Sequence, residues 1–204
     1  MKTLARILMV LAGLLTASLF FFPMWRIDLT APQYPDGLGM YIYIDHLEGV
    51  KPGDLKNIDI LNHYVGMKPL PKPDEMWEFT VFPIVVGIMA ALAIVFALIG
   101  KPILYLVWFA LMSILGLLGL YDFYLWLYDY GTNLDPEAPI KLVDEYGNPM
   151  KYVPPLIGYK QLLNFEVYSY PAIGGVLLGI GILLSLIAYW IAHKTQSKHK
   201  IHVS

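Results

Sequence analysis

Four long apolar stretches constrain the fold of this chain more than any other feature of its sequence. An α-helix rises about 1.5 Å per residue, so roughly 20 apolar residues cross the ~30 Å hydrocarbon layer of a membrane. Stretches of this length with almost no charge lie at Leu4–Phe22, Val81–Gly100, Ile103–Trp126 and Ala172–Ala192. The chain is 57% hydrophobic and only 15% charged, which is too apolar for a soluble domain. The sequence therefore predicts an integral membrane protein with four spans.

The predicted fold class is an all-α membrane protein: a four-helix transmembrane bundle with a small mixed α/β extracytoplasmic region formed by two loops. Lys2 and Arg6 precede the first apolar run, as they would in a signal peptide, but no small-residue cleavage site follows where one is expected. We therefore favour a retained first span. The predicted segments are transmembrane helices over 1–23, 81–100, 103–128 and 171–192, loops over 24–80 and 129–170, and a basic cytoplasmic tail over 193–204.

The distribution of charge predicts the orientation of the spans. Basic residues are enriched on the cytoplasmic side of membrane proteins. Six of the 14 basic residues lie in very short pieces of chain, at the two termini and at the turn between the second and third spans: Lys2, Arg6, Lys101, Lys194, Lys198 and Lys200. All 16 acidic residues lie in or beside the two loops, with the other eight basic residues. We therefore expect both termini in the cytoplasm and both loops on the far side of the cytoplasmic membrane.

Several classes of function are disfavoured by what the sequence lacks. It contains no cysteine, which excludes disulfides and thiolate metal sites, and no basic patch that would indicate nucleic acid. It has no nucleophile elbow, phosphate-binding glycine loop or metalloprotease helix motif, so we do not expect an enzyme. Transporters usually hold ionisable groups at the membrane midplane, where this chain has only Thr16, Ser113 and Ser185.

Local patterns predict some structure within the loops. Leu38–Ile44 alternates with a period of two and predicts a β-strand. A short helix is expected from Asp54, as its N-cap, to about Val65, with Gly66 as the C-terminal cap. The apolar positions of Pro155–Tyr168 suit a short amphipathic helix on the membrane surface or on the first loop.

Small residues recur at four-residue spacing within the apolar stretches. This spacing allows close approach of helix backbones, which we expect within one molecule rather than between copies. The pairs are Gly13 with Ala17, Gly87 with Ala91, and Gly175 with Gly179.

The most chemically distinctive residues lie close together in the first loop. Thioether sulfur selects Cu(I), and imidazole serves both oxidation states of copper. These residue types predict a copper site with the candidate ligands His63, Met67, His46 and Met40. The alternative interpretation is that His63 bonds to Asp59 or to backbone, and that Met67 packs in a hydrophobic core.

Three carboxylates form a second candidate set. Asp122, Asp129 and Glu166 lie near the ends of the loops and could gather at the mouth of the bundle, where they would contact a cation or a protein partner. Solvation at the helix ends and hydrogen bonds from tyrosines explain these acids equally well.

The stretch Trp25–Leu38 followed by Leu61–Met67 resembles a group of small multi-pass bacterial membrane proteins associated with copper handling and with nitrous oxide reductase accessory genes. The resemblance covers mainly residues 25–67. It implies copper delivery or metalloenzyme maturation at the extracytoplasmic face, with His63 and Met67 as the matched positions.

Two functional hypotheses follow. The first is a non-enzymatic accessory protein of the cytoplasmic membrane whose extracytoplasmic region binds copper and assists maturation of a periplasmic metalloenzyme. The alternative is a structural subunit of a larger membrane complex that binds no metal. Both require the lipid bilayer and a protein partner at the extracytoplasmic face, and neither involves nucleic acid.

Overall fold

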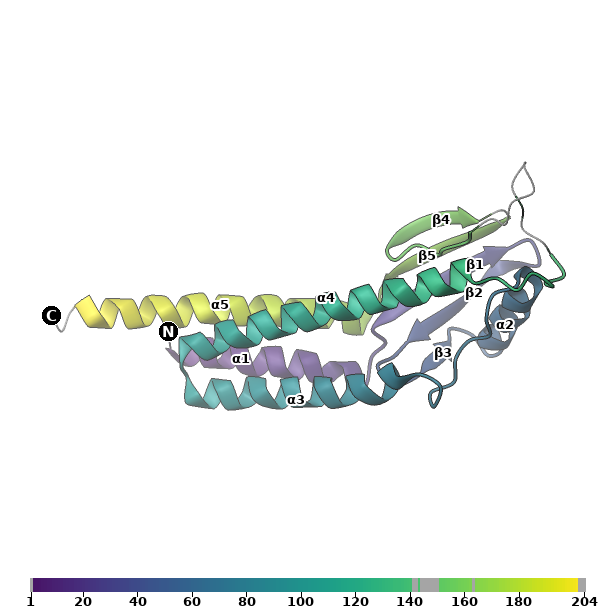
Figure 1. The fold of residues 1–204 in the computed structure, drawn as a ribbon. Helices are drawn as coiled ribbons and strands as arrows, with labels where there is room; N and C mark the ends of the chain where they lie inside the picture. Colours follow the sequence, from purple (N-terminus) through teal and green to yellow (C-terminus); the bar gives the residue numbers. More distant parts are fainter. Residues whose placement is uncertain (1, 141–142, 144–150, 163, 202–204) are drawn as a thin grey trace.

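The computed structural model describes residues 2–140, 143, 151–162 and 164–201 of the chain. Figure 1 shows a bundle of long helices with a β-sheet at one end, and both termini at the opposite end. The bundle consists of α1 (Lys2–Ala17, extended by the 3-10 turn η1 over Ser18–Phe20), α3 (Trp77–Ile99), α4 (Pro102–Thr132) and α5 (Ile173–Ile201).

All four of these helices are long and apolar enough to cross a membrane. Four apolar helices of spanning length are therefore confirmed, and the chain is a multi-pass membrane protein. Sequence and structure agree here because each apolar stretch is about as long as the hydrocarbon layer requires, and that length is a local property of the sequence.

Helix α1 packs against both α3 and α5, and α4 closes the bundle by contacting the same two helices. The contacts are made by small side chains, which let the helices approach closely. On α4, the indole Nε1–H of Trp108 donates to the carbonyl of Met89 on α3 at 2.8 Å, so its one polar group is paired inside the bundle. The buried alanines of the main core cluster of the bundle are Ala5, Ala12, Ala93, Ala97, Ala188 and Ala192.

The sheet at the end of the bundle has five antiparallel strands in the order β3-β2-β1-β5-β4. The first loop supplies β1 (Trp25–Ala31), β2 (Tyr34–Ile42) and β3 (Leu47–Gly49), and the second supplies β4 (Gly158–Leu162) and β5 (Phe165–Pro171). Pairing of β1 with β5, from Trp25 opposite Pro171 to Thr30 opposite Glu166, joins the two loops into one sheet. We call the sheet, with α2 (Asp54–Val65) and the last turns of α4, the sheet domain.

This sheet corrects the predicted fold class, because the protein is mixed α/β and not all-α. The amphipathic helix predicted over Pro155–Tyr168 is wrong, since most of that segment forms β4 and the start of β5. The β5 part of the segment pairs with β1, about 140 residues earlier in the sequence, and β4 pairs in turn with β5. Long-range pairing of this kind overrides the local propensity on which the helix prediction relied.

The strand and helix predicted in the first loop are present. Strand β2 covers most of the predicted segment but begins four residues earlier, at Tyr34. Helix α2 runs from Asp54 to Val65 as predicted, and Gly66 ends it in the left-handed conformation with φ 81°.

The predicted N-cap of α2 is wrong, because Gly53 takes that position. Asp54 is buried, and its Oδ2 accepts the backbone N–H groups of Gly39 and Lys51 at 3.0 Å each. The carboxylate therefore ties the start of α2 to strand β2.

The last turns of α4 pack against one face of the sheet. The helix has 31 residues and is about 46 Å long, so it continues well beyond the hydrocarbon layer. Phe123 packs edge-on against Trp25 of β1 with ring centroids 5.5 Å apart, and Leu127 is fully buried under the sheet. At Gly131, an added Cβ would lie 2.4 Å from the backbone of Val153, so glycine is required where this segment crosses the helix.

A second close approach joins α5 to the chain that leaves η1. The backbone N–H of Gly174 donates to the carbonyl of Pro23 at 2.9 Å, and that of Ala172 to Met24 at 3.1 Å. A Cβ added to Gly175 would lie 2.4 Å from the carbonyl oxygen of Met24, whereas one added to Gly179 would meet nothing within 4 Å. Of the predicted pair of small residues on α5, only the first makes a close contact.

We predict that Gly175→Ala lowers the thermal unfolding midpoint of the detergent-solubilised protein, because the methyl group would push α5 away from Met24. Overpacking of this kind costs about 1–3 kcal/mol. Gly179→Ala is the matched control and should unfold at or slightly above the wild-type temperature. Equal midpoints for the two variants would contradict the close approach.

Candidate functional site

One face of the sheet is turned away from α4 and is rich in tyrosine. Successive side chains of a strand point to opposite faces, and Trp25, Ile27, Met40, Ile42 and Val167 all pack on the side of α4. The residues between them therefore point outward. We call this surface the tyrosine face; it comprises Arg26, Asp28, Tyr41, Tyr159, Tyr168 and Tyr170.

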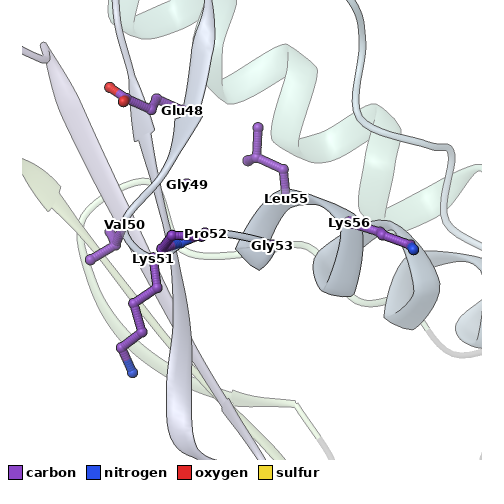
Figure 2. Close-up of a pocket in the computed structure, with 8 residues that line it drawn as sticks. All are labelled: Glu48, Gly49, Val50, Lys51, Pro52, Gly53, Leu55 and Lys56. Atoms are coloured by element: carbon purple, nitrogen blue, oxygen red, sulfur yellow. The ribbon is translucent and has the colours of Figure 1, made fainter.

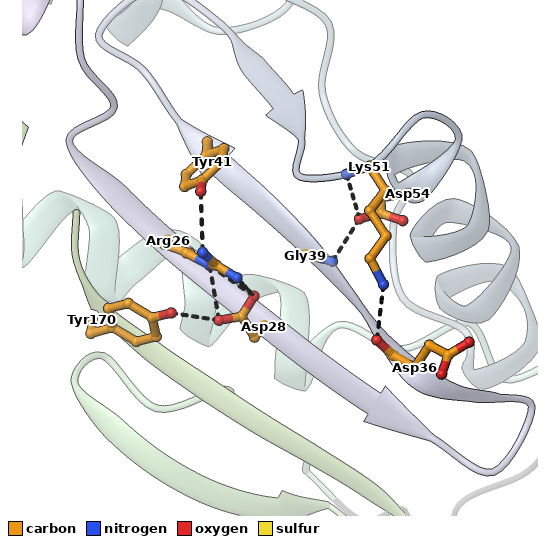
Figure 3. Close-up of polar contacts among 8 residues, drawn as sticks. All are labelled: Arg26, Asp28, Asp36, Gly39, Tyr41, Lys51, Asp54 and Tyr170. Atoms are coloured by element: carbon orange, nitrogen blue, oxygen red, sulfur yellow. Dashed lines mark hydrogen bonds and ion pairs between the residues drawn. The ribbon is translucent and has the colours of Figure 1, made fainter. Parts of the chain in front are cut away.

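An ion pair lies at the centre of the tyrosine face (Figure 3). The Nε of Arg26 donates to both carboxylate oxygens of Asp28, at 2.9 and 3.0 Å, and its Nη2 lies 2.9 Å from Oδ1. Asp28 also accepts the hydroxyl of Tyr170 at 2.6 Å, while Nη1 of Arg26 donates to the hydroxyl of Tyr41 at 3.1 Å. The network thus links β2, β1 and β5, and so connects the two loops.

The rings of the tyrosine face are arranged around this pair. The guanidinium of Arg26 lies 5.3 Å from the ring centroid of Tyr41 and 6.0 Å from that of Tyr170, within the range of cation–π attraction. On the next strands, the rings of Tyr159 and Tyr168 lie 4.8 Å apart and remain 50% and 42% exposed. The face therefore presents large aromatic groups whose positions are held by their neighbours.

Glycine in the middle of β2 makes room for the network. Gly39 lies opposite Asp28, and a Cβ at this position would come 2.8 Å from Oδ1 of Asp28 and 2.6 Å from Cγ2 of Val50. A side chain here would displace the carboxylate from Arg26.

Two groups of the network, Arg26 and Tyr170, have pKa values shifted further from neutrality. The hydrogen bond from Arg26 to Asp28 raises the pKa of the guanidinium. Burial, together with the hydrogen bond to Asp28, raises the pKa of the Tyr170 hydroxyl. Arg26 is therefore charged and Tyr170 neutral at neutral pH.

The candidate copper ligands are distributed between the core and the surface. Met40 is 5% exposed, and Met67 packs against the same hydrophobic cluster. His63 is exposed on α2, and His46 bonds to Asp45 at 2.6 Å and stacks on Tyr43. The alternative interpretation of Met67 as a core residue is confirmed, and copper binding by the four residues stays a prediction.

Two further observations bear on metal binding. Asp59, the alternative partner for His63, accepts the backbone N–H of Leu70 at 2.6 Å. Within the described part of the chain, no three side chains of His, Asp or Glu gather in a group that could hold a metal ion.

The three candidate carboxylates do not lie together. Asp129 forms an ion pair with Lys68 at 2.5 Å. Glu166 lies on β5 opposite Thr30, on the side of the sheet turned away from α4. Asp122, on α4, makes no hydrogen bond or ion pair with any residue that the structure describes.

An open hollow of about 400 Å³ lies between β3 and the start of α2 (Figure 2). Lys51 and Lys56 line it beside the N-terminus of the helix, a combination that would suit an anion. The carboxylate of Asp54 already accepts the backbone N–H of Lys51, so the chain supplies its own anion there. The hollow is therefore a structural feature of the α2 junction.

Sequence reasoning missed the tyrosine face, although a signal for it was present. Trp25-Arg26-Ile27-Asp28-Leu29 alternates apolar with charged residues, which is typical of a half-buried strand. Glu166, Tyr168 and Tyr170 alternate with Val167 and Ser169 in the same way. This alternation predicts the strands, but no local pattern predicts the register that places Arg26 between Tyr41 and Tyr170.

No known protein family, curated protein or solved structure matches this chain. The fold and the surface together define a multi-pass membrane protein with a sheet domain at one end of its bundle. Its function must therefore be argued from the geometry of that domain.

We predict that Arg26→Gln lowers the stability of the sheet domain by about 1 kcal/mol, because Asp28 loses its charged partner and both side chains are partly exposed. Thermal unfolding followed by tyrosine fluorescence or near-UV circular dichroism measures the change. Lys56→Gln, which removes an exposed cation from α2, is the control and should have no effect. An unchanged midpoint for Arg26→Gln would show that the network does not stabilise the sheet.

Proposed function

We propose that this chain is a non-catalytic accessory subunit of the cytoplasmic membrane, and that the tyrosine face of its extracytoplasmic sheet domain binds a protein partner. The observation that carries the proposal is the exposed, preorganised set of tyrosines around Arg26. Tyrosine and arginine are enriched at protein interfaces, where large rings of low conformational freedom contribute much of the binding energy.

The distribution of charge supports the proposed orientation. Both termini lie at the end of the bundle opposite the sheet (Figure 1), together with the turn at Lys101. Six basic residues lie at or beside that end, while all 16 acidic residues belong to the loops and adjoining helix ends. The positive-inside rule then assigns the sheet domain to the extracytoplasmic side.

Charge also indicates the chemistry of the partner. Arg26 and Asp28 neutralise one another at the centre of the face, and Glu48 and Glu166 stand at its rim, opposite Tyr41 and Gln161. The loops and adjoining helix ends carry 16 acidic and eight basic residues. A partner with a basic surface would complement this domain and would be steered toward it.

Of the two roles predicted from the sequence, copper binding and protein binding, we favour protein binding. It uses the exposed rings of Tyr159 and Tyr168, whereas the copper site would need the buried Met40. Assistance in the maturation of a periplasmic metalloenzyme is compatible with it. In that case the tyrosine face would hold the enzyme itself, and no copper ligand is required of Met40 or Met67.

The absence of cysteine allows a direct test of the orientation. We expect His63→Cys, on the exposed side of α2, to react with a membrane-impermeant maleimide in spheroplasts. Lys101→Cys, in the turn between α3 and α4, should react only after the membrane is permeabilised. The opposite pattern would place the sheet domain in the cytoplasm and would contradict the proposal.

We predict that the double variant Tyr159→Ser/Tyr168→Ser loses its partner while keeping its fold. Loss of two anchoring rings should cost about 2 kcal/mol or more, a weakening of roughly 30-fold. The measurement is quantitative mass spectrometry of proteins that co-purify with the tagged chain from native membranes. The control is Tyr64→Ser, which removes a 48%-exposed tyrosine from α2.

A protein enriched with wild type and with Tyr64→Ser, but lost with the double variant, supports the proposal. An identical set of co-purifying proteins for all three chains, at equal thermal stability, would contradict it.

A further inference from the structure

The end of the bundle opposite the sheet carries positive charge that no acid of the chain neutralises (Figure 1). Lys2 and Arg6 lie on the first turns of α1, and Lys101 lies in the turn between α3 and α4. We call these three residues and the turn the basic end. The nearest acids along α3 and α4 are Glu78 and Asp122, about 30 Å away. An ion pair needs contact within about 4 Å, so the chain supplies no carboxylate for these cations.

Helix α4 begins at the basic end, and its N-terminus has no side-chain cap. The first N–H groups of a helix have no partner within the helix, and with the helix dipole they attract anions. Lys101 is the N-cap residue of α4, but its side chain makes no capping hydrogen bond, and the first turn contains no acid. The start of α2 differs, because Asp54 supplies a carboxylate there. The start of α4 therefore attracts an anion from outside the chain.

The guanidinium of Arg6 packs against the same turn. An added Cβ on Gly100 would lie 2.6 Å from Nη2 and 2.8 Å from Nε of Arg6. Gly100 ends α3 with φ 73°, and the C-terminal end of a helix attracts a cation, which helps to hold Arg6 in place. Neither Arg6 nor Lys101 forms an ion pair with any residue that the structure describes. The planar fork of a guanidinium matches the oxygens of a phosphate group.

A buried hydroxyl lies beside Arg6. Tyr105 is 1% exposed and lies on the first turn of α4. Side chains of a helix lean toward its N-terminus, which directs this hydroxyl toward the basic end. Among the residues that the structure describes, it is the one buried side-chain polar atom that forms no hydrogen bond, and Arg6 is the charged group that interacts with it. An unpaired buried hydroxyl is costly, and an anion bound at Arg6 would supply the acceptor that it lacks.

We propose that the basic end binds the phosphate of an anionic phospholipid, with Arg6, Lys101 and the N-terminus of α4 as donors and the hydroxyl of Tyr105 as a further donor. The site lies where α3 ends and α4 begins, at the boundary of the spans, and lipid headgroups lie at that depth. Cations without internal acids favour a lipid of net negative charge. This inference goes beyond the proposed function, because it concerns the opposite end of the molecule and does not depend on the tyrosine face.

The first experiment identifies the ligand. The full chain is reconstituted in bilayers of phosphatidylglycerol and phosphatidylcholine in equal parts, extracted in mild detergent and analysed by native mass spectrometry. Both lipids carry the phosphodiester, but only phosphatidylglycerol has a net negative charge. We expect phosphatidylglycerol to be retained in preference by about tenfold or more, as charge-assisted hydrogen bonds predict. Equal retention of the two lipids would overturn the inference.

Inorganic phosphate provides the second arm of this experiment. Phosphate and sodium chloride are added to the extracted protein at matched ionic strength. We expect phosphatidylglycerol to stay bound equally in both. Displacement by phosphate alone would show that the site takes free phosphate, and would overturn its assignment to a lipid.

The second experiment tests the two cations. Arg6→Gln/Lys101→Gln should lower the retention of phosphatidylglycerol by about tenfold or more, because both charged donors are lost. The matched control Lys56→Gln/Lys72→Gln removes two exposed cations from the first loop and should retain the lipid. Equal loss with the two pairs would show that retention follows net charge alone, and would overturn the site. Labelling of His63→Cys in the Arg6→Gln/Lys101→Gln background checks that the orientation of the chain is unchanged.

The third experiment tests the hydroxyl without disturbing the bundle. Tyr105→Phe keeps the ring and removes an unpaired polar group, so the unfolding midpoint in lipid-free detergent should be unchanged or slightly higher. Retention of phosphatidylglycerol should fall by about threefold or more, as the loss of one hydrogen bond predicts. Unchanged retention would overturn the assignment of this hydroxyl to the site.

Discussion

The pairing of β1 with β5 is the interaction on which the rest of the structure depends. Strand β1 follows α1 after a short turn, and β5 leads directly into α5, so the two strands continue the antiparallel contact of these helices beyond the membrane. Each loop alone would expose an unpaired strand edge, whose N–H and C=O groups need partners. Joining the loops satisfies both edges. It also brings Arg26 of the first loop beside Tyr170 of the second, which creates the centre of the tyrosine face.

Helix α4 determines how the sheet is held relative to the membrane. It is one uninterrupted helix from the turn at Lys101 to Thr132, and its last turns form the underside of the sheet domain. Additional bonds fix its end, because Lys68 pairs with Asp129, and the hydroxyl of Tyr130 bonds to the carbonyl of Pro69. The sheet is thus attached to the bundle through three elements, α1, α4 and α5. A domain attached in this way presents its exposed face in a fixed orientation, which lowers the entropic cost of binding a partner.

Features that depend on local sequence were predictable, and features that depend on distant pairing were not. The four apolar helices, helix α2 and its cap at Gly66 each follow from one continuous stretch of sequence. Strand β5 was misinterpreted as a helix because Phe165, Val167 and their neighbours fit either period over so short a stretch. The candidate functional residues show the same difference between local sequence and distant pairing. His63 and Met67 are close in sequence, yet one is exposed and the other packs in the core, whereas Arg26 and Tyr170 meet only through the register of the sheet.

The acidic side chains that position the sheet domain are paired within the chain. Asp28 has Arg26, Asp54 has two backbone N–H groups, and Asp129 has Lys68, so each of these acids is compensated within the chain. Asp122 is the exception among them, since it makes no hydrogen bond or ion pair with any residue that the structure describes. At the centre of the tyrosine face, Asp28 is neutralised by Arg26 on the same strand. A partner can therefore cover the rings of this face without leaving a charge unpaired in the interface, which is the condition under which buried aromatic contacts contribute most to binding.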